Sequence, residues 1–375
     1  MKDLRKKIAK KARRVVIKVG SAVIAAPPVD GADIFARLAS AIKELKTSGR
    51  ETAVVSSGAI ALGMRRLGMR DRPVAIPERQ AAAAVGQGSL MAMYDSAFSA
   101  VEEKAAQVLL THDDLGSRKR FLNARNTLTA LFRLGIVPVI NENDTVAVEE
   151  IKFGDNDALS ALATNLVEAD LLLILSDIDG LYEKDPKAFP DAKKVHVVED
   201  VDALRTDSMA NSANRLGTGG IRSKCEAARL AAHFGAATVI ANGNRPGVIS
   251  RVMAGEDEGT LFLPKEDRLT SKKHWIAFSA RPTGRVFVDN GARDALLEKG
   301  RSLLPSGISE VDGAFEAGEV VHCVDQSGME FARGVANYSS SEIKRIKGLK
   351  TADVVGVLGY KVYDEVIHRD NLVVL

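Results

Sequence analysis

The sequence predicts an α/β protein in which helices cover both faces of a mostly parallel sheet, followed by a smaller β-rich domain. Short apolar, β-branched runs alternate with longer stretches of helical periodicity from residue 14 to about residue 252, which is typical of βαβ units. Near residues 264–273 the pattern becomes polar and aperiodic, and short segments bounded by turn residues follow. At about 150 residues per domain, 375 residues favour two or three domains.

The elements of the first part follow one another in a regular order. The run VVIKVG at 15–20 predicts a buried strand, and the apolar residues Ile34, Leu38, Ile42 and Leu45 predict a helix over 33–48. A strand over 52–57 runs directly into a helix that starts at Gly58. Further strands are predicted at 106–111, 136–140, 171–176 and 237–242, and further helices at 118–134, 156–168 and 220–234.

This pattern divides the chain into four parts. We predict a basic leader at 1–14, an α/β domain at 15–264, a linker at 265–273 and a β-rich domain at 274–375. The last domain contains the segments WIAF, RVFV, GEVVHCV, FARGVANY and VYDEVIH and a small helix at 291–299, and it would be barrel-like if its sheet closes.

Charge is concentrated at the N-terminus. The formal net charge is +3, but residues 1–14 alone carry +7 and the β-rich domain carries −2. An export signal would need an uninterrupted apolar run after the leader, and Lys18 and Gly20 interrupt it. We therefore expect a solvated, frayed leader and a cytoplasmic protein without a membrane span.

Several kinds of site are excluded by composition. The two cysteines form no CxxC pair, and no two histidines lie within four residues of each other, so neither a disulfide framework nor a helical zinc site is expected. The chain has no Gly-Lys pair, which excludes a Walker-type P-loop. Anions must therefore be bound in another way.

Three motifs at strand ends could bind phosphate. Lys18 precedes Gly20 where the first strand ends, Ser56 and Ser57 precede Gly58, and a glycine-rich run at 217–224 opens a helix. Backbone N–H groups at a helix N-terminus, together with lysine, bind anions. Each motif also has a purely structural explanation: a surface lysine beside a turn, a simple helix cap, or a loosened loop.

Polar residues also gather where the next strands end. Asn141-Glu142-Asn143-Asp144 closes one strand, Gly154-Asp155-Asn156-Asp157 opens a helix, and Ser176-Asp177 begins the run to Tyr182. Asn and Asp favour caps and turns, so Asp155 could be only an N-cap. A carboxylate such as that of Asp144 would suit a substrate ammonium group.

Together these features favour phosphoryl transfer. That chemistry depends mostly on positioning and on charge stabilisation, and the chain offers two lysines, glycine-rich anion sites and no catalytic histidine. A carboxylate acceptor, with a reference pKa of about 4.3 for Glu, is ionised at pH 7 and needs no general base. Lysines, helix N-termini and Mg²⁺ would offset the charge of the two anions.

The motifs resemble those of the amino acid kinase superfamily and, within it, of the glutamate 5-kinase family. The matching segments are KVGS (18–21), SSGAIALG (56–63), RQAAAAVGQ (79–87), RFLNARNTL (120–128), VPVINENDTV (137–146), EIKFGDNDALSA (150–161), DGLYEKDP (179–186) and LGTGGIRSK (216–224). The C-terminal segment is similar to PUA domains. The resemblance implies the amino acid kinase fold with a PUA barrel, and phosphorylation of the γ-carboxylate of glutamate by ATP.

The resemblance also implies a role for individual residues. Lys18 and Lys224 would bind the phosphates and stabilise the transferring group, with Asp157 between them to orient them. Ser57, Asp144 and Asn156 would bind glutamate, helped by Asn141. Contacts to ATP would come from Lys18, Ser176, Asp177, Thr218, Gly219, Gly220, Ile221, Arg222, Ser223 and Lys224. ATP and Mg²⁺ are the expected cofactors, with no metal bound by protein ligands.

Other acceptors and partners remain open at this point. The same fold could serve N-acetylglutamate, aspartate or UMP, although Asp144 favours a free ammonium group. RNA binding is the alternative function from another class of protein. RNA binding usually needs a concentrated basic face, whereas the PUA-like domain carries a net charge of −2. We expect inhibition by proline, a homo-oligomer (dimer or tetramer) and possible channelling to the next pathway enzyme.

Overall fold

The computed structural model describes residues 2–29, 33–147, 156–184, 186, 188–204, 220–265, 273, 275–280, 282–361 and 363–375. The chain divides into two compact units, each with its own hydrophobic core. The first unit comprises residues 1–115 and 119–268, and the second comprises residues 116–118 and 269–375.

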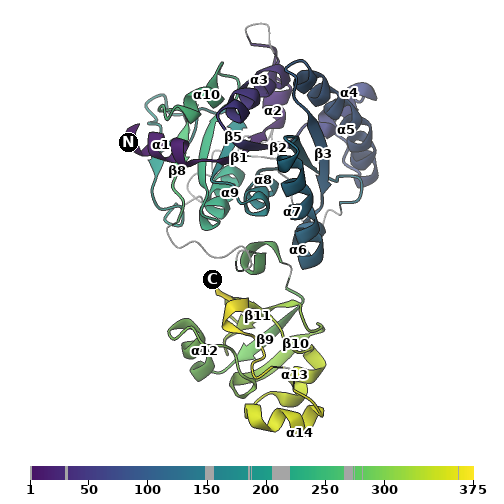
Figure 1. Ribbon diagram of the computed structural model, residues 1–375, viewed down its shortest axis with the longest axis vertical. Coiled ribbons are helices and arrows are strands. Elements are labelled where there is room, and N and C mark those ends of the chain that lie inside the picture. The colour runs from purple at the N-terminus through teal and green to yellow at the C-terminus, as the bar shows by residue number, and fades with distance from the viewer. Residues whose placement is uncertain are drawn as a thin grey trace. The chain divides into compact units, whose positions relative to one another are not determined.

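An eight-stranded, mostly parallel sheet forms the centre of the first unit, as predicted (Figure 1). Its strands lie in the order β3-β4-β2-β1-β5-β7-β8-β6, and among these pairs only β7 and β8 are antiparallel. The bounds are β1 (Arg14–Val19), β2 (Glu51–Ser56), β3 (Ala105–Leu110), β4 (Val137–Glu142), β5 (Leu171–Ser176), β6 (Val197–Val198), β7 (Ala237–Asn242) and β8 (Thr260–Phe262).

Helices cover both faces of this sheet, with α3 and α10 on one face and α8 and α9 on the other (Figure 1). The helices are α2 (Ser21–Ile24), α3 (Ile34–Thr47), α4 (Ala59–Arg66), α5 (Ile76–Ser99), α6 (His112–Gly116), α7 (Arg118–Arg133), α8 (Asn156–Val167), α9 (Ile221–His233) and α10 (Val248–Met253). None of the helices in the described segments is long and apolar enough to span a membrane.

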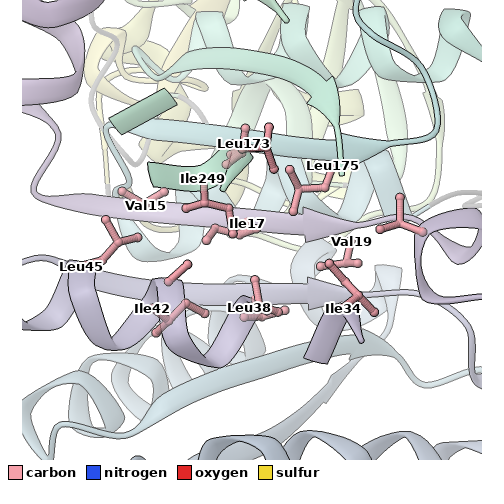
Figure 2. Packing of buried hydrophobic residues seen from close by; sticks show 14 of the residues in the cluster. Val15, Ile17, Val19, Ile34, Leu38, Ile42, Leu45, Leu173, Leu175 and Ile249 are labelled. Atoms are coloured by element: carbon pink, nitrogen blue, oxygen red, sulfur yellow. The ribbon is translucent and has the colours of Figure 1, made fainter. Parts of the chain in front are cut away.

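Strand β1 separates an apolar face from a charged one. Its residues Val15, Ile17 and Val19 are buried against the predicted apolar face of α3 (Figure 2). Successive side chains of a strand point to opposite faces of the sheet, so Lys18 is directed to the face covered by α8. The alternation of β1 thus places one lysine under the start of α8.

The second unit is β-rich, as predicted. Its sheet has the order β10-β9-β11-β12-β13, with β9 (Gly284–Val288), β10 (Ile308–Gly313), β11 (Val320–Val324), β12 (Glu330–Val335) and β13 (Leu372–Val374). Its helices are α12 (Asn290–Leu297), α13 (Ser340–Ile346) and α14 (Val354–Leu358), with short turns at Trp275–Ser279, Pro305–Gly307, Thr351–Asp353 and Arg369–Asn371. The segment WIAF therefore forms a helical turn, and the last strand lies beyond VYDEVIH.

The expectation of a frayed leader is wrong. Residues Lys2–Lys11 form the helix α1, in which Ala9 is buried and Arg5 is only 5% exposed. The Arg5 guanidinium donates to the backbone carbonyls of Glu258 (2.8 Å), His196 (2.7 Å) and Gly259 (3.2 Å). The charge count of the leader does not show this role. One of its eight basic residues ties the helix to the residues just before strands β6 and β8.

We predict that Arg5→Met lowers the free energy of unfolding by about 2–4 kcal/mol, because the substitution leaves buried carbonyl groups without their donor. Urea unfolding of the full chain measures the effect. Lys7→Met, at an exposed position of the same helix, is the control and should change stability by less than about 0.5 kcal/mol. Equal stability of the two variants would show that Arg5 does not anchor the leader.

Candidate active site

The predicted site residues gather at the carboxyl edge of the first sheet. The strands β4, β2, β1 and β5 are consecutive neighbours, and their carboxyl ends meet the N-termini of α8 and α9. The chain leaves β1 towards β2 on one side, and it leaves β5 towards β7 on the other. Open α/β sheets bind ligands at such a switch point. Lys18, on β1, lies next to it.

A charged cluster occupies the centre of this edge. Asp157, in the first turn of α8, is fully buried and bridges two lysines that come from opposite ends of the α/β domain. Its Oδ1 forms an ion pair with Lys18 Nζ, and its Oδ2 lies 3.2 Å from Lys224 Nζ. Ser223 Oγ donates to the same Oδ2 at 2.8 Å. Both lysines are themselves buried: Lys18 is 2% and Lys224 is 5% exposed. Because both pair with the same carboxylate, their ammonium groups are held close together.

The N-terminus of α9 opens beside this cluster. Gly220 is the N-cap with extended backbone and no side chain to cap the helix, and the Ser223 hydroxyl, which contacts Asp157, also lies 2.9 Å from its carbonyl oxygen. Ile221, Arg222 and Lys224 lie in the first turn, whose N–H groups have no partners within the helix. This is an anion-binding arrangement. Thr218 and Gly219 lie outside the described residues.

An amide cluster lies next to the charged cluster. Asn156 Nδ2 lies within hydrogen-bond distance of three acceptors, which share its two N–H groups: the carbonyl oxygen of Ser56 (2.7 Å), Ser57 Oγ (3.1 Å) and Asn141 Oδ1 (2.9 Å). These bonds bring together Ser57, Asn141 and Asn156, three of the residues assigned to the acceptor. Asn156 and Asp157 are consecutive at the start of α8, so one helix end joins the amide cluster to the lysines.

Backbone hydrogen bonds fix the strand ends that carry these groups. Ser57 N donates to the carbonyl of Val19 at 3.2 Å, and Gly20 N donates to that of Leu175 at 3.0 Å. A Cβ on Gly20 would lie 3.2 Å from the Leu175 carbonyl and 3.8 Å from Lys18 Nζ. The absence of a side chain at Gly20 therefore leaves its backbone close to the ammonium group.

Ser176 and Asp177 stand at the end of β5. Ser176 is 4% exposed, its Oγ donates to Asp177 Oδ1 at 3.0 Å, and its carbonyl accepts from Gly243 N at 2.8 Å. They lie on the opposite side of β1 from the amide cluster, because β5 and β2 flank β1 in the sheet. The site thus has two sides with Lys18 between them.

Two carboxyl groups at and just after the end of β4 have raised pKa values. Burial raises the pKa of Asp144 to about 6, while the charges of Arg79 and Arg72 oppose the shift. Burial, and then the charge of Asp144, raises the pKa of Glu142 to about 7. Among the described residues Asp144 makes no hydrogen bond to Ser57 or Asn156. Its place near the amide cluster is therefore indicated only by its position in the sequence, two residues after the end of β4.

Some functional groups were not singled out from the sequence. Glu142 could have been noted from its place inside the polar run 141–144, and Gln87 from its place at the end of a quoted motif. Tyr94 gave no signal, since it is one aromatic residue on a helix that was not predicted.

Within the described segments no group of three or more His, Cys, Asp or Glu side chains could hold a metal ion. Asp155 lies outside them.

Comparison with known proteins gives two matching families. Residues 13–242 match the amino acid kinase family, and residues 284–358 match the PUA domain. The glutamate 5-kinase of Citrifermentans bemidjiense is 51% identical over 374 residues, which cover 99% of this chain and all of the relative. The glutamate 5-kinase of Geobacter metallireducens is 51% identical over 373 residues, with the same coverage.

A more distant relative, the glutamate 5-kinase of Caldanaerobacter subterraneus, is 48% identical over 363 residues that cover 96% of this chain and 98% of the relative. The resemblance read from the motifs is thereby confirmed along the whole chain. The chain belongs to the amino acid kinase family and, within it, to the glutamate 5-kinases, and it carries a C-terminal PUA domain.

Proposed function

We propose that this protein transfers the γ-phosphoryl group of ATP to the γ-carboxylate of L-glutamate, giving L-glutamyl 5-phosphate and ADP. The observation that carries the proposal is the buried carboxylate of Asp157, which holds Lys18 and Lys224 together at the edge of the sheet. A reaction between two anions needs two cations at one place. The names of the full-length relatives support the choice of glutamate.

The nucleotide would bind on the side of β5 and α9. The first turn of α9, from Gly220 to Lys224, would face the phosphates, with Thr218 and Gly219 completing the same run. Ser176 and Asp177 would contact the remainder of ATP. Lys18 and Lys224 would stabilise charge on the transferring group, because preorganised cations in a buried site are most effective there. Mg²⁺ would enter with ATP as part of the substrate and offset further phosphate charge.

The acceptor would bind on the side of β2 and β4. Its γ-carboxylate is ionised at pH 7, so one carboxylate oxygen attacks the γ-phosphorus while the bond from phosphorus to the ADP oxygen breaks, and no proton is transferred. Ser57 and Asn156, supported by Asn141, would hold the glutamate. Asp144 would pair with the ammonium group of glutamate. An acylated nitrogen carries no positive charge and could not form this ion pair.

The orientation of Asn156 suits this role. Its amide nitrogen is held by acceptors of the protein, so its Oδ1 is directed away from them. Among the described residues this oxygen has no hydrogen-bond partner. A carbonyl oxygen accepts from an ammonium group and cannot donate to a carboxylate, so it would favour the amino end of the substrate.

The family membership supports the wider setting of the proposal. The product would serve proline biosynthesis in the cytoplasm, and proline would inhibit through the acceptor side because it shares the ammonium and carboxylate groups of glutamate. A homo-oligomer, dimer or tetramer, and channelling of the labile acyl phosphate to the next enzyme belong to the same proposal. We also propose the predicted boundaries 15–264 and 274–375 for the two domains.

Hydroxylamine trapping tests the proposed reaction. With glutamate, MgATP and hydroxylamine, the protein should form the γ-glutamyl hydroxamate, because hydroxylamine attacks the acyl phosphate directly. N-acetylglutamate and aspartate are the control acceptors. Hydroxamate from either control at the rate found with glutamate, or none with glutamate, would refute the assigned acceptor.

We predict that Lys224→Ala lowers kcat by about 10²-fold or more and leaves the KM for glutamate nearly unchanged, because it removes a cation that acts on the transferring group. Steady-state kinetics separate the two constants. Arg229→Ala is the control, since Arg229 lies on the same helix but is exposed and pairs with Glu226. Near-normal turnover of Lys224→Ala would contradict the role assigned to this lysine.

We predict that the KM for glutamate falls as the pH rises through about 6, because only the ionised carboxylate of Asp144 attracts an ammonium group. Burial raises this pKa, so Asp144 becomes protonated, and glutamate binding weakens, at a higher pH than for an exposed Asp. In Asp144→Asn the KM for glutamate should be about tenfold higher and flat over this range, with the KM for ATP unchanged. A variant that keeps the wild-type pH profile would exclude Asp144 from binding.

A further inference from the structure

Two side chains from one face of helix α5 contact the acceptor side of the site. Gln87 contacts the amide cluster, and Tyr94 contacts Ser56 at the end of β2. Gln87 and Tyr94 are seven residues apart, which is close to two helical turns, so both point the same way. Between them Leu90 is fully buried in the core of the sheet. Neither Gln87 nor Tyr94 belongs to the charged cluster or to the residues assigned to substrate contact.

The first contact extends the amide cluster. Asn141 Nδ2 donates to Gln87 Oε1 at 2.8 Å, while Asn141 Oδ1 accepts from Asn156. A chain of hydrogen bonds therefore runs from the Ser56 carbonyl through Asn156 and Asn141 to Gln87. Each amide in this chain uses its nitrogen as the donor to the next group.

The polarity of this chain is set at its fixed end. The Ser56 carbonyl can only accept, so the nitrogen of Asn156 must face it, and the same orientation then propagates through Asn141. At the open end the buried Gln87 Nε2 has no hydrogen-bond partner among the described residues. Gln87 Oε1 supplies the acceptor for the Asn141 nitrogen in this orientation, so without it the Asn141 amide would lose one of the two contacts that hold it in place.

The second contact fixes the end of β2. The Tyr94 hydroxyl donates to Ser56 Oγ at 2.8 Å, and Ser56 Oγ donates to the carbonyl of Ser57 at 3.1 Å. Tyr94 is fully buried, and its ring packs edge-on against Phe35 with 4.9 Å between ring centroids. Burial raises the pKa of Tyr94, so its hydroxyl stays protonated and remains a donor.

Helix α5 is itself held rigidly beside the site. At Gly63 of α4 a Cβ would lie 1.7 Å from the Ala82 carbonyl, and at Gly86 of α5 it would lie 1.8 Å from the Ala59 carbonyl. The two helices are thus in backbone contact one residue before Gln87. Such contact leaves α5 little freedom to shift relative to the start of α4, which only Gly58 separates from Ser57.

From these contacts we infer that α5 is the positioning element of the acceptor site: Gln87 orients Asn156 through Asn141, and Tyr94 orients Ser57 through Ser56. The inference rests on the proposed function, in which Ser57 and Asn156 bind glutamate. Neither residue touches the substrate. Both hold in place the neighbours that would face it, so their loss should weaken glutamate binding and leave the nucleotide side intact.

Kinetics of Gln87→Met and Tyr94→Phe test the inference. Each variant keeps the size of the side chain and removes one hydrogen bond, so we expect the KM for glutamate to rise about five- to tenfold. The KM for ATP should stay unchanged. Gln87→Glu restores an acceptor for Asn141 and should recover most of the wild-type KM. Met91→Ala, which removes apolar packing from the same helix without a polar contact, should lower the melting temperature and leave the KM for glutamate unchanged.

A double-mutant cycle separates positioning from general destabilisation. If Gln87 acts through Asn156, adding Gln87→Met to Asn156→Ala should change the KM for glutamate by less than about twofold. An unchanged KM in the single variants, parallel changes for both substrates, or a full additional effect in the double variant would overturn the inference. Wild-type protein that forms no glutamate hydroxamate would instead refute the proposed function, which distinguishes the two failures.

Discussion

The site depends on one interaction, the pairing of the buried Asp157 carboxylate with Lys18 and Lys224. Removing three charged groups from water costs several kcal/mol for each ion, and buried ion pairs seldom repay this fully. Stability alone is therefore a poor reason for such a cluster. The sheet and two helices hold two ammonium groups in one fixed place, which is what the proposed reaction between two anions would require.

The start of α8 connects this cluster to the acceptor side. Asn156 and Asp157 are neighbours in sequence, and one binds the amide cluster while the other holds the lysines. Any movement of the helix end would displace both together. Support comes from both faces of the sheet, because α9 carries Lys224 on one face and α5 contacts Ser56 on the other. The distance between the two reacting anions would follow from this rigid frame.

Much of the fold could be predicted because the strands of a parallel sheet are buried on both faces and read as apolar runs. The strands over 171–176 and 237–242 were placed without error, and the other predicted strands of the first unit shifted by about one or two residues. Helix α5 was missed because its apolar residues occur all round it, among alanines and glycines, so no stripe marks a buried face. The leader was misjudged because its charge count does not show that Arg5 is buried.

The positions of the candidate site residues could be predicted from the sequence, but their orientations and pKa values could not. Residues at strand ends could be found because parallel strands bring their carboxyl ends to one edge, which places Lys18, Ser57, Asn141 and Ser176 together. The orientation of Asn156 could not be read, since it depends on acceptors from Ser56 and on support from α5. Nor could the raised pKa of Asp144, because the sequence does not show burial.

The turnover of Asp157→Asn tests the central claim most directly. The substitution keeps the size of the side chain and removes the charge that holds the lysines together, and circular dichroism would first establish that the variant is folded at the assay temperature. We predict that glutamate-dependent hydroxamate formation at saturating substrates falls by about 10²-fold or more. Turnover within about threefold of the wild type would contradict the account, because the two lysines would then need no common carboxylate to act.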